Sequence, residues 1–322
     1  MSNKTIAKIF GFVISAAFIA VFFSACSNVS SSDNKISAAQ SHYNKPKIIG
    51  TIKNADVTES SGLAASKCKD NVLWTHNDSD DGPFIFAVNS AGESLGTWKV
   101  KNAENEDWED IAAYKDKTGQ CYLYIGEIGD NKLKRGKQAV YRVREPNIKA
   151  EDANSNSKKP LETEPAEIAK FEYPDQLQNS ETLMVHPVTG DVYVLTKRVN
   201  GPSAVYRFRP MFGSSDVTKM EKIADLSVPA VPNGVLTGGD ISPDGSRLVI
   251  CDYGQGYELA LPKTDTNFED IWEQTPEIID LGKRKQGESI CYNSDGNAIF
   301  AGSEGRNSPI IEVKRERPLM HE

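Results

Sequence analysis

The sequence predicts an all-β protein, a five-bladed β-propeller with four-stranded blades. Three observations predict this fold: one unit recurs five times, each unit contains four short strand-like runs, and Gly, Pro, Asn or Asp separate the runs. The third, fourth and fifth units place "HPVTGDV", "SPDGSR" and "NSDGNA" between their first two runs. These segments are typical hairpin turns, in which Gly supplies a positive φ.

The repeat sets the order of the blades along the chain. The first residues of the units follow one another in steps of 48, 72, 58 and 49 residues, at Ser61, Glu109, Glu181, Gly239 and Glu288. The long step contains "NIKAEDANSNSKKPLETEP", which we expect to form a polar surface loop. The fifth unit lacks its outer run and "KPKIIGTIKN" supplies one, so an N-terminal strand is expected to close the last blade. A sixth blade within residues 212–236 would be too short.

The start of the chain predicts export. A short basic region and an apolar run from Ile9 to Phe23 lead to small residues and Cys26, as in a bacterial lipoprotein signal peptide over residues 1–26. A single membrane-spanning helix is the alternative, but it needs about 20 apolar residues. We therefore expect a protein lipidated (with palmitate) at Cys26 and anchored in the membrane of the bacterial cell envelope.

The remainder of the chain divides into two parts. Residues 27–45 are polar and Ser-rich, which predicts a flexible tether, and residues 46–322 are expected to form a single propeller domain. The formal net charge of −8 argues against a nucleic-acid partner.

Four cysteines follow Cys26, an even number that fits an oxidising compartment. They lie in neighbouring units, and of three possible connectivities we expect Cys68–Cys121 and Cys251–Cys291. Buried free thiols are the alternative.

The acidic residues at the starts of the units predict a cation site. Glu109, Glu181 and Glu288 share one position at the mouth of the channel, where Ser61 holds the same place in the first unit and Asp240 lies beside it in the fourth. Carboxylates about 4 Å apart repel by roughly 4 kcal/mol per pair at an effective dielectric of 20, and a bound cation removes that repulsion. Oxygen ligands without His or Cys favour Ca²⁺ over Zn²⁺. The alternative is that the acids cap backbone N–H groups.

A second group of polar residues follows the second strand of each unit and is expected on the same face of the propeller. We predict this ligand face to contain His76, Asn77, Asp78, Glu127, Asp130, Asn131, Lys197, Arg198, Asp252 and Glu304. His76 is a candidate general base, and Lys197 with Arg198 would hold an anionic group. Many of the others also favour turns. Trp108 is expected to pack between blades, with its indole N–H bonded to a loop.

The motifs "DWEDIA" and "GEIGDN", with "SGLAAS", "SETLMVHPVTGDVYVLTKR", "GGDISPDG" and "GESICYNSDG", resemble a largely uncharacterised family of secreted or lipid-anchored bacterial β-propellers. The resemblance covers nearly all of the chain after the tether and implies the fold. A more distant likeness is to the five-bladed calcium-activated nucleotidases (apyrases), which hold calcium in the central tunnel through Glu and Ser oxygens. Glu109, Glu181, Glu288 and Ser61 match that pattern in type and register.

Two functions from different classes follow. The first is a cell-envelope lipoprotein whose propeller binds a small anionic ligand or a protein partner on its acidic channel face, organised by Ca²⁺. The second is a Ca²⁺-dependent hydrolase of phosphate esters, lactones or similar anionic substrates. The sequence favours the first, because no nucleophile–base motif is present in it.

Overall fold

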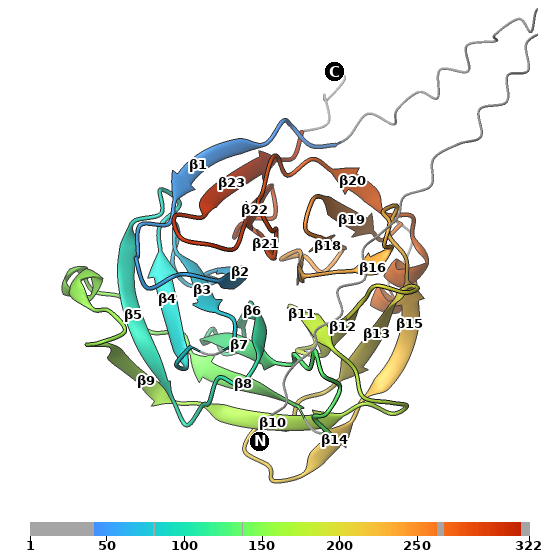
Figure 1. Cartoon of the computed structure of the whole chain (residues 1–322), viewed down its shortest axis with the longest axis horizontal. Coiled ribbons are helices and arrows are strands. Elements are labelled where there is room, and N and C mark those ends of the chain that lie inside the picture. The colour runs from blue at the N-terminus through green and yellow to red at the C-terminus, as the bar shows by residue number, and fades with distance from the viewer. Residues whose placement is uncertain (1–41, 80, 137, 263–266, 317–322) are drawn as a thin grey trace, which may run out of the picture. The chain divides into compact units, whose positions relative to one another are not determined.

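The computed structural model describes residues 42–316, except residues 80, 137 and 263–266. Within these residues the chain forms five small sheets arranged in a ring around a central axis (Figure 1), so the prediction of a five-bladed β-propeller is confirmed. Residues 1–41, with the predicted signal peptide, Cys26 and most of the tether, lie outside the described part. The described residues include no helix that is long and apolar enough to cross a membrane.

Each blade has four antiparallel strands, counted outward from the axis. Blade 1 contains β2 (Ser60–Ala65), β3 (Leu73–Asn77), β4 (Phe84–Val88) and β5 (Ser94–Lys101). Blade 2 contains β6 (Trp108–Lys115), β7 (Cys121–Glu127), β8 (Gln138–Arg144) and β10 (Glu167–Glu172). Blade 3 contains β11 (Ser180–Val185), β12 (Val192–Arg198), β13 (Ser203–Phe208) and β15 (Glu221–Leu226).

Blade 4 contains β17 (Gly238–Ile241), β18 (Arg247–Cys251), β19 (Gly256–Ala260) and β20 (Glu277–Ile279). Blade 5 contains β21 (Ser289–Tyr292), β22 (Ala298–Gly302), β23 (Pro309–Lys314) and β1 (Lys47–Thr51). We call the face on which the chain enters each inner strand the mouth face. The loops after the second strands open on the same face, because the strands alternate in direction.

The predicted closure of the ring by an N-terminal strand is confirmed. Strand β1 pairs antiparallel with β23, with Lys47 opposite Glu312, and lies at the rim of blade 5 (Figure 1). The propeller begins earlier than predicted: Tyr43, expected in the tether, is 7% exposed, and its hydroxyl donates a 2.5 Å hydrogen bond to Glu258. Residues 42–45 therefore belong to the domain.

The polar insertion between β8 and β10 of blade 2 is not the simple surface loop that the sequence predicts, but contains secondary structure. It contains a short 3₁₀ helix, η1 (Ala150–Asn154), and β9 (Leu161–Pro165), which pairs parallel with β5. Strand β10 of blade 2 begins two residues later, so this segment crosses the outside of blades 1 and 2 (Figure 1). The sequence did not predict β9, because its residues are mostly polar. An edge strand can be polar when it buries few side chains, and β9 buries only Thr163.

Residues 212–236 form no sixth blade. They supply β14 (Val217–Lys219), which extends blade 2 beside β10, the outer strand β15 of blade 3, and β16 (Gly234–Val235), which pairs with β12. A second 3₁₀ helix, η2 (Phe268–Glu273), contacts β15 and β19.

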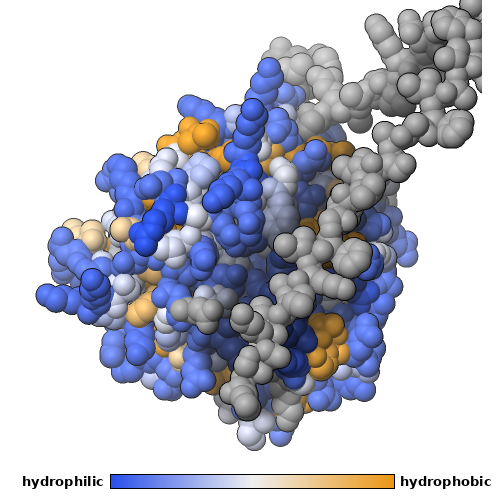
Figure 2. Space-filling model, viewed as in Figure 1, coloured by the Kyte–Doolittle hydropathy of each residue, from blue (hydrophilic) through white to orange (hydrophobic). Residues whose placement is uncertain are grey.

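The hydrophobic core lies in layers between neighbouring blades. The inner strands of blades 1, 3, 4 and 5 are fully buried, as are the first six residues of β6, because these strands face the axis and are covered by blades on both sides. Between blades 1 and 2, Trp74 stacks edge-on against Trp98 at 5.3 Å, and Trp108 donates its indole N–H to the Glu104 carbonyl at 2.9 Å. Trp108 thus packs between blades as expected. Figure 2 shows hydrophilic residues over most of the visible surface, with hydrophobic ones in separate patches.

The two predicted disulfides have different outcomes. Cys68, in the loop after β2, and Cys121, the first residue of β7, are bonded and join blades 1 and 2, as predicted. The predicted Cys251–Cys291 bond is wrong: both thiols are free and buried. Cys251 belongs to the core layer between blades 4 and 5, whereas Cys291 belongs to the layer between blades 5 and 1. The two thiols therefore lie on opposite sides of blade 5. The repeat places both cysteines on strands of neighbouring blades, but it does not show to which side of its strand each side chain points.

Candidate cation site on the mouth face

Three carboxylates converge on the mouth face. One ligating oxygen from each of Asp78, Asp107 and Glu109 lies within 4.8 Å of the others. Asp78 follows β3 of blade 1, Asp107 precedes β6, and Glu109 is the second residue of β6. The cluster therefore spans the junction of blades 1 and 2.

A β-bulge aims Glu109 at the mouth. The pairing of β6 with β7 shifts between Trp108 and Asp110, which leaves Glu109 as the extra residue. The same shift occurs at Ser61 in β2 and at Glu181 in β11. A bulge turns its extra residue out of the regular alternation of the strand. Three of the positions aligned in the sequence repeat are thus the same local structure.

The loop before β6 is held by polar contacts. Glu127 accepts hydrogen bonds from the backbone N–H groups of Glu106 and Asp107 at 3.0 and 2.9 Å. Asn105 donates to the Asp78 carbonyl at 2.8 Å, which ties this loop to blade 1. These bonds fix Asp78 and Asp107 relative to each other before any ion binds.

Gly129 lets the carboxylates approach the backbone. A Cβ atom at this position would lie 2.3 Å from Glu109 Oε1 and 2.5 Å from the carboxyl carbon of Asp107. No side chain fits there, so Gly129 of "GEIGDN" is needed because the carboxylates of Glu109 and Asp107 lie against its Cα, and not because its backbone has a positive φ.

Glu109 is the least satisfied member of the cluster. Its side chain belongs to a residue that is 3% exposed, and its Oε1 has no hydrogen-bond partner among the described residues. Burial, followed by the charges of Glu181, Asp78 and Asp107, raises the pKa of Glu109 well above its usual range. Burial likewise raises the pKa of Asp107 to about 6 and, to a lesser extent, that of Asp78. Lys197 opposes these shifts at Asp78 and Glu109, and Arg135 opposes the shift at Asp107, but burial outweighs both cations.

The other predicted metal residues lie close by but have partners. Glu181 forms a 2.6 Å ion pair with Lys197, and burial raises its pKa to about 7. Glu288 accepts a 2.9 Å hydrogen bond from Gln286, while burial and neighbouring Glu304 raise its pKa to about 9. The hydroxyl of Ser61 donates to the Glu109 backbone carbonyl at 2.6 Å. Of the five predicted ligands, the cluster contains only Glu109.

Asp240 is turned away from the cluster. Its carboxylate accepts the N–H groups of Ile241 and Tyr292 at 2.9 and 3.0 Å, and Lys67 lies 3.9 Å away. Asp110 does the same in blade 2, accepting from Ile111, from Leu183 of blade 3 at 3.0 Å and from Gly239 of blade 4 at 3.2 Å. Both aspartates follow the aligned position by one residue and bind the backbone of other blades.

His76 is buried in blade 1 and not on the ligand face. It is 0% exposed, donates from Nδ1 to the Asn77 carbonyl at 2.8 Å, and packs edge-on against Trp108. Burial lowers the pKa of His76 to about 4. A ring without access to the face cannot take a proton from a ligand bound there.

Most other residues of the predicted ligand face hold loops in place. Asn77, Glu127, Asp130 and Asp252 accept backbone N–H groups with their side-chain oxygens. Arg198 donates to Gln178 at 3.0 Å, and exposed Asn131 accepts from Asn179 at 3.1 Å. Asp78 is part of the acidic cluster, and the charges of Lys197 and Glu304 act on it.

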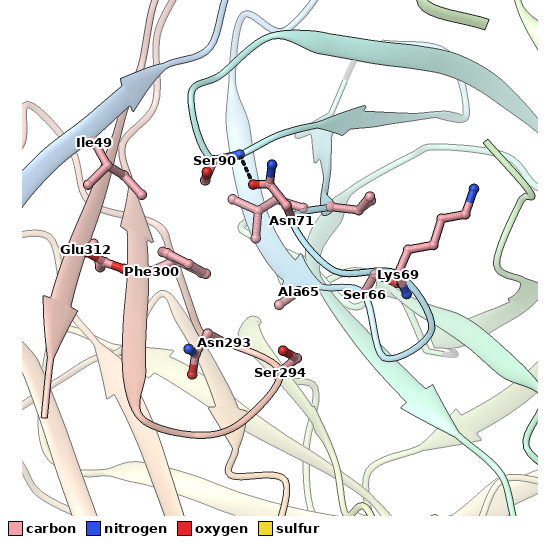
Figure 3. Close-up of a pocket in the computed structure, with 12 residues that line it drawn as sticks. Ile49, Ala65, Ser66, Lys69, Asn71, Ser90, Asn293, Ser294, Phe300 and Glu312 are labelled. Carbon is pink, nitrogen blue, oxygen red and sulfur yellow. Dashed lines mark hydrogen bonds between the residues drawn. The ribbon is translucent and has the colours of Figure 1, made fainter. Parts of the chain in front are cut away.

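A pocket of about 370 Å³ lies on the opposite face, between blades 5 and 1 (Figure 3). On the blade 1 wall of the pocket, Ser90 donates its N–H to Asn71 at 3.0 Å, and Lys69 donates to the Ile148 carbonyl at 2.7 Å. This pocket contains no cluster of unsatisfied polar groups among the described residues, so the mouth face is the stronger candidate.

Comparisons with known proteins give no family. No family model matches the chain, and no curated protein matches it. Among solved structures, a chain in a crystal structure of a nidogen/laminin complex is similar over 76% of this chain and 72% of its own length, with 14% identity and a TM-score of 0.42. A similarity at this level carries no argument about function.

Proposed function

We propose that this propeller is a binding protein whose mouth face holds Ca²⁺ through Asp78, Asp107 and Glu109, and that the ion organises this face for a ligand or partner. The proposal includes export and a lipid anchor at Cys26, on the sequence pattern alone. Glu109 carries the proposal, because its Oε1 is buried, unpartnered and within 4.8 Å of two other carboxylates.

The chemistry of the cluster favours a hard cation. All three groups are carboxylates, and neither His nor Cys belongs to the cluster, which suits oxygen-binding ions and not Zn²⁺. Ca²⁺ accepts 6–8 oxygens in irregular geometry, whereas Mg²⁺ requires a compact octahedron. The three carboxylates belong to one strand and two loops, an arrangement that suits the irregular coordination of Ca²⁺ better than the octahedral coordination of Mg²⁺.

The hydrolase alternative is weaker. Of its two candidate bases, His76 or a free acid, His76 is fully buried. Turnover of phosphate esters or lactones by the Ca²⁺-loaded protein, lost in Glu109→Gln, would favour this alternative.

A thermal melt tests the proposed site. The protein is stripped with EDTA and then melted alone and with millimolar Ca²⁺, Mg²⁺ or Zn²⁺. A ligand that binds only the native state raises the melting temperature, so we expect a clear rise with Ca²⁺. The variant Asp107→Asn should lose this rise, whereas Glu151→Gln, which removes an exposed acid in η1, should keep it. No rise with any ion in the stripped protein would refute the site.

A further inference from the structure

A second pocket adjoins the cation cluster on the mouth face. It has a volume of about 350 Å³, and Asp107 lines it as well as belonging to the cluster. The loop between β7 and β8 forms much of its wall and contributes Lys132, Lys134 and Arg135. Cationic side chains therefore stand next to the place where the ion is expected.

The loop that carries these cations is built rigidly. Asp130 accepts the backbone N–H groups of Lys134 and Arg135 at 2.9 and 2.7 Å. The Arg135 guanidinium donates to the Gly129 carbonyl at 2.7 Å and pairs with Glu127 at 2.6 Å. Each terminal nitrogen of Arg135 carries a second hydrogen, so the fixed guanidinium can still donate into the pocket.

The charge of the pocket depends on the ion. Three cationic side chains face three acids, Glu106, Asp107 and Asp130, so the lining is formally neutral without a cation. A divalent ion held by Asp107 would add two positive charges beside this lining, and these would offset the charges of Asp78 and Glu109, the other two carboxylates of the cluster. In addition, three carboxylates do not complete the 6–8 oxygen ligands of Ca²⁺, which leaves coordination positions for oxygens of a ligand.

We propose that this pocket binds an oxyanion, a phosphate or carboxylate group, which completes the coordination of the bound Ca²⁺ and accepts hydrogen bonds from Lys132, Lys134 and Arg135. This inference rests on the proposed cation site and assigns the ligand class of that site. The anion binds only after the cation, since the pocket has no excess positive charge before it.

Calorimetric titration of the purified full chain tests the inference. Phenylphosphonate is the phosphate-like probe and benzoate the carboxylate probe, each titrated into Ca²⁺-loaded and into EDTA-treated protein. We expect binding of at least one probe to the loaded protein, and binding at least tenfold weaker after EDTA. The probe that binds identifies which of the two oxyanions the site prefers.

Two double variants locate the binding. In Lys132→Ala/Lys134→Ala, we expect probe affinity to fall at least tenfold, because charged hydrogen bonds are lost, while the Ca²⁺-induced rise in melting temperature remains. Lys115→Ala/Lys117→Ala removes two exposed lysines from the opposite face and should leave probe affinity unchanged.

The outcomes separate this inference from the proposed function. A Ca²⁺-induced rise without binding of either probe overturns the oxyanion site and leaves the cation site standing. Equal probe binding with and without Ca²⁺, or equal binding by both double variants, also overturns it. No rise with Ca²⁺ overturns both.

Discussion

Replacing Glu109 with Gln should stabilise the protein without calcium and should remove most of the stabilisation that calcium adds. Gln keeps the shape of the side chain and removes its charge. Two ionised carboxylates at 4.8 Å repel by about 3.5 kcal/mol at an effective dielectric of 20, and closer groups repel more. Protonation of Glu109 relieves part of this repulsion in the wild type. Without calcium we therefore expect Glu109→Gln to be more stable than the wild type, by up to about 3 kcal/mol.

With calcium the wild type should be the more strongly stabilised protein. At a calcium concentration of 100 times Kd, binding adds about 2.7 kcal/mol to the free energy of unfolding. A variant that binds a hundredfold more weakly gains only about 0.4 kcal/mol under the same conditions. For a domain of this size each kcal/mol corresponds to roughly 2–4 °C, so we expect the wild-type melting temperature to rise by about 5–10 °C and that of the variant by about 1 °C.

Differential scanning calorimetry in EDTA and in calcium measures both effects. A variant that is destabilised equally in both conditions would refute the reasoning, because Glu109 would then be a structural cap. A variant that keeps the full calcium-induced rise would also refute it.

A glycine pair provides an independent check of the geometry. Gly129→Ala places a methyl group against Glu109 and Asp107 and should reduce the calcium-induced rise, whereas Gly136→Ala in the same loop meets no atom within 4 Å and should keep it. Equal calcium responses of the two variants would show that the close approach at Gly129 does not matter for the ion.

Three further predictions concern stability. The disulfide closes a loop with a sequence separation of 53 residues, so Cys68→Ser/Cys121→Ser should lose up to about 4 kcal/mol of unfolding free energy in urea titrations, and an unchanged midpoint would contradict this. Cys251 and Cys291 are buried, so a thiol reagent should label neither in the native protein and both after denaturation; rapid native labelling would show that they are accessible. Asp110→Ala leaves three backbone N–H groups without their acceptor and should cost about 3–5 kcal/mol with or without calcium, whereas a loss under 1 kcal/mol would mean that water replaces the carboxylate.

The fold was predictable because it depends on a period. Each blade repeats the spacing of strands and turns, and the missing outer strand of blade 5 had one available source in the sequence, "KPKIIGTIKN". Strand β9 was not predictable, because its pairing with β5 joins two segments that are far apart in the sequence, with Trp98 opposite Leu161, on the outside of the ring.

The site was only partly predictable. The repeat identified the positions of Glu109 and Glu181. It did not show that Lys197 forms an ion pair with Glu181, or that Glu109 Oε1 has no hydrogen-bond partner among the described residues. Asp240 could have been recognised as structural, because in the repeat it aligns with Asp110 and not with Glu109. Asp107 joins the cluster through a loop whose conformation depends on Glu127, a contact between segments that no local pattern reveals.

The pairing of β1 with β23 has a consequence for the synthesis of the protein. The other four blades each form from strands that are made close together in time, but β1 pairs with β23, the last of the described strands, with Thr51 opposite Pro309. At 5–20 residues per second, β1 waits roughly 15–50 s for its partner to be translated. Throughout that time its apolar residues Ile48 and Ile49 are an unpaired strand edge, which invites aggregation. Lys45, Lys47 and Lys53 flank them, and these charges disfavour aggregation of the nascent chain while the ring is still open.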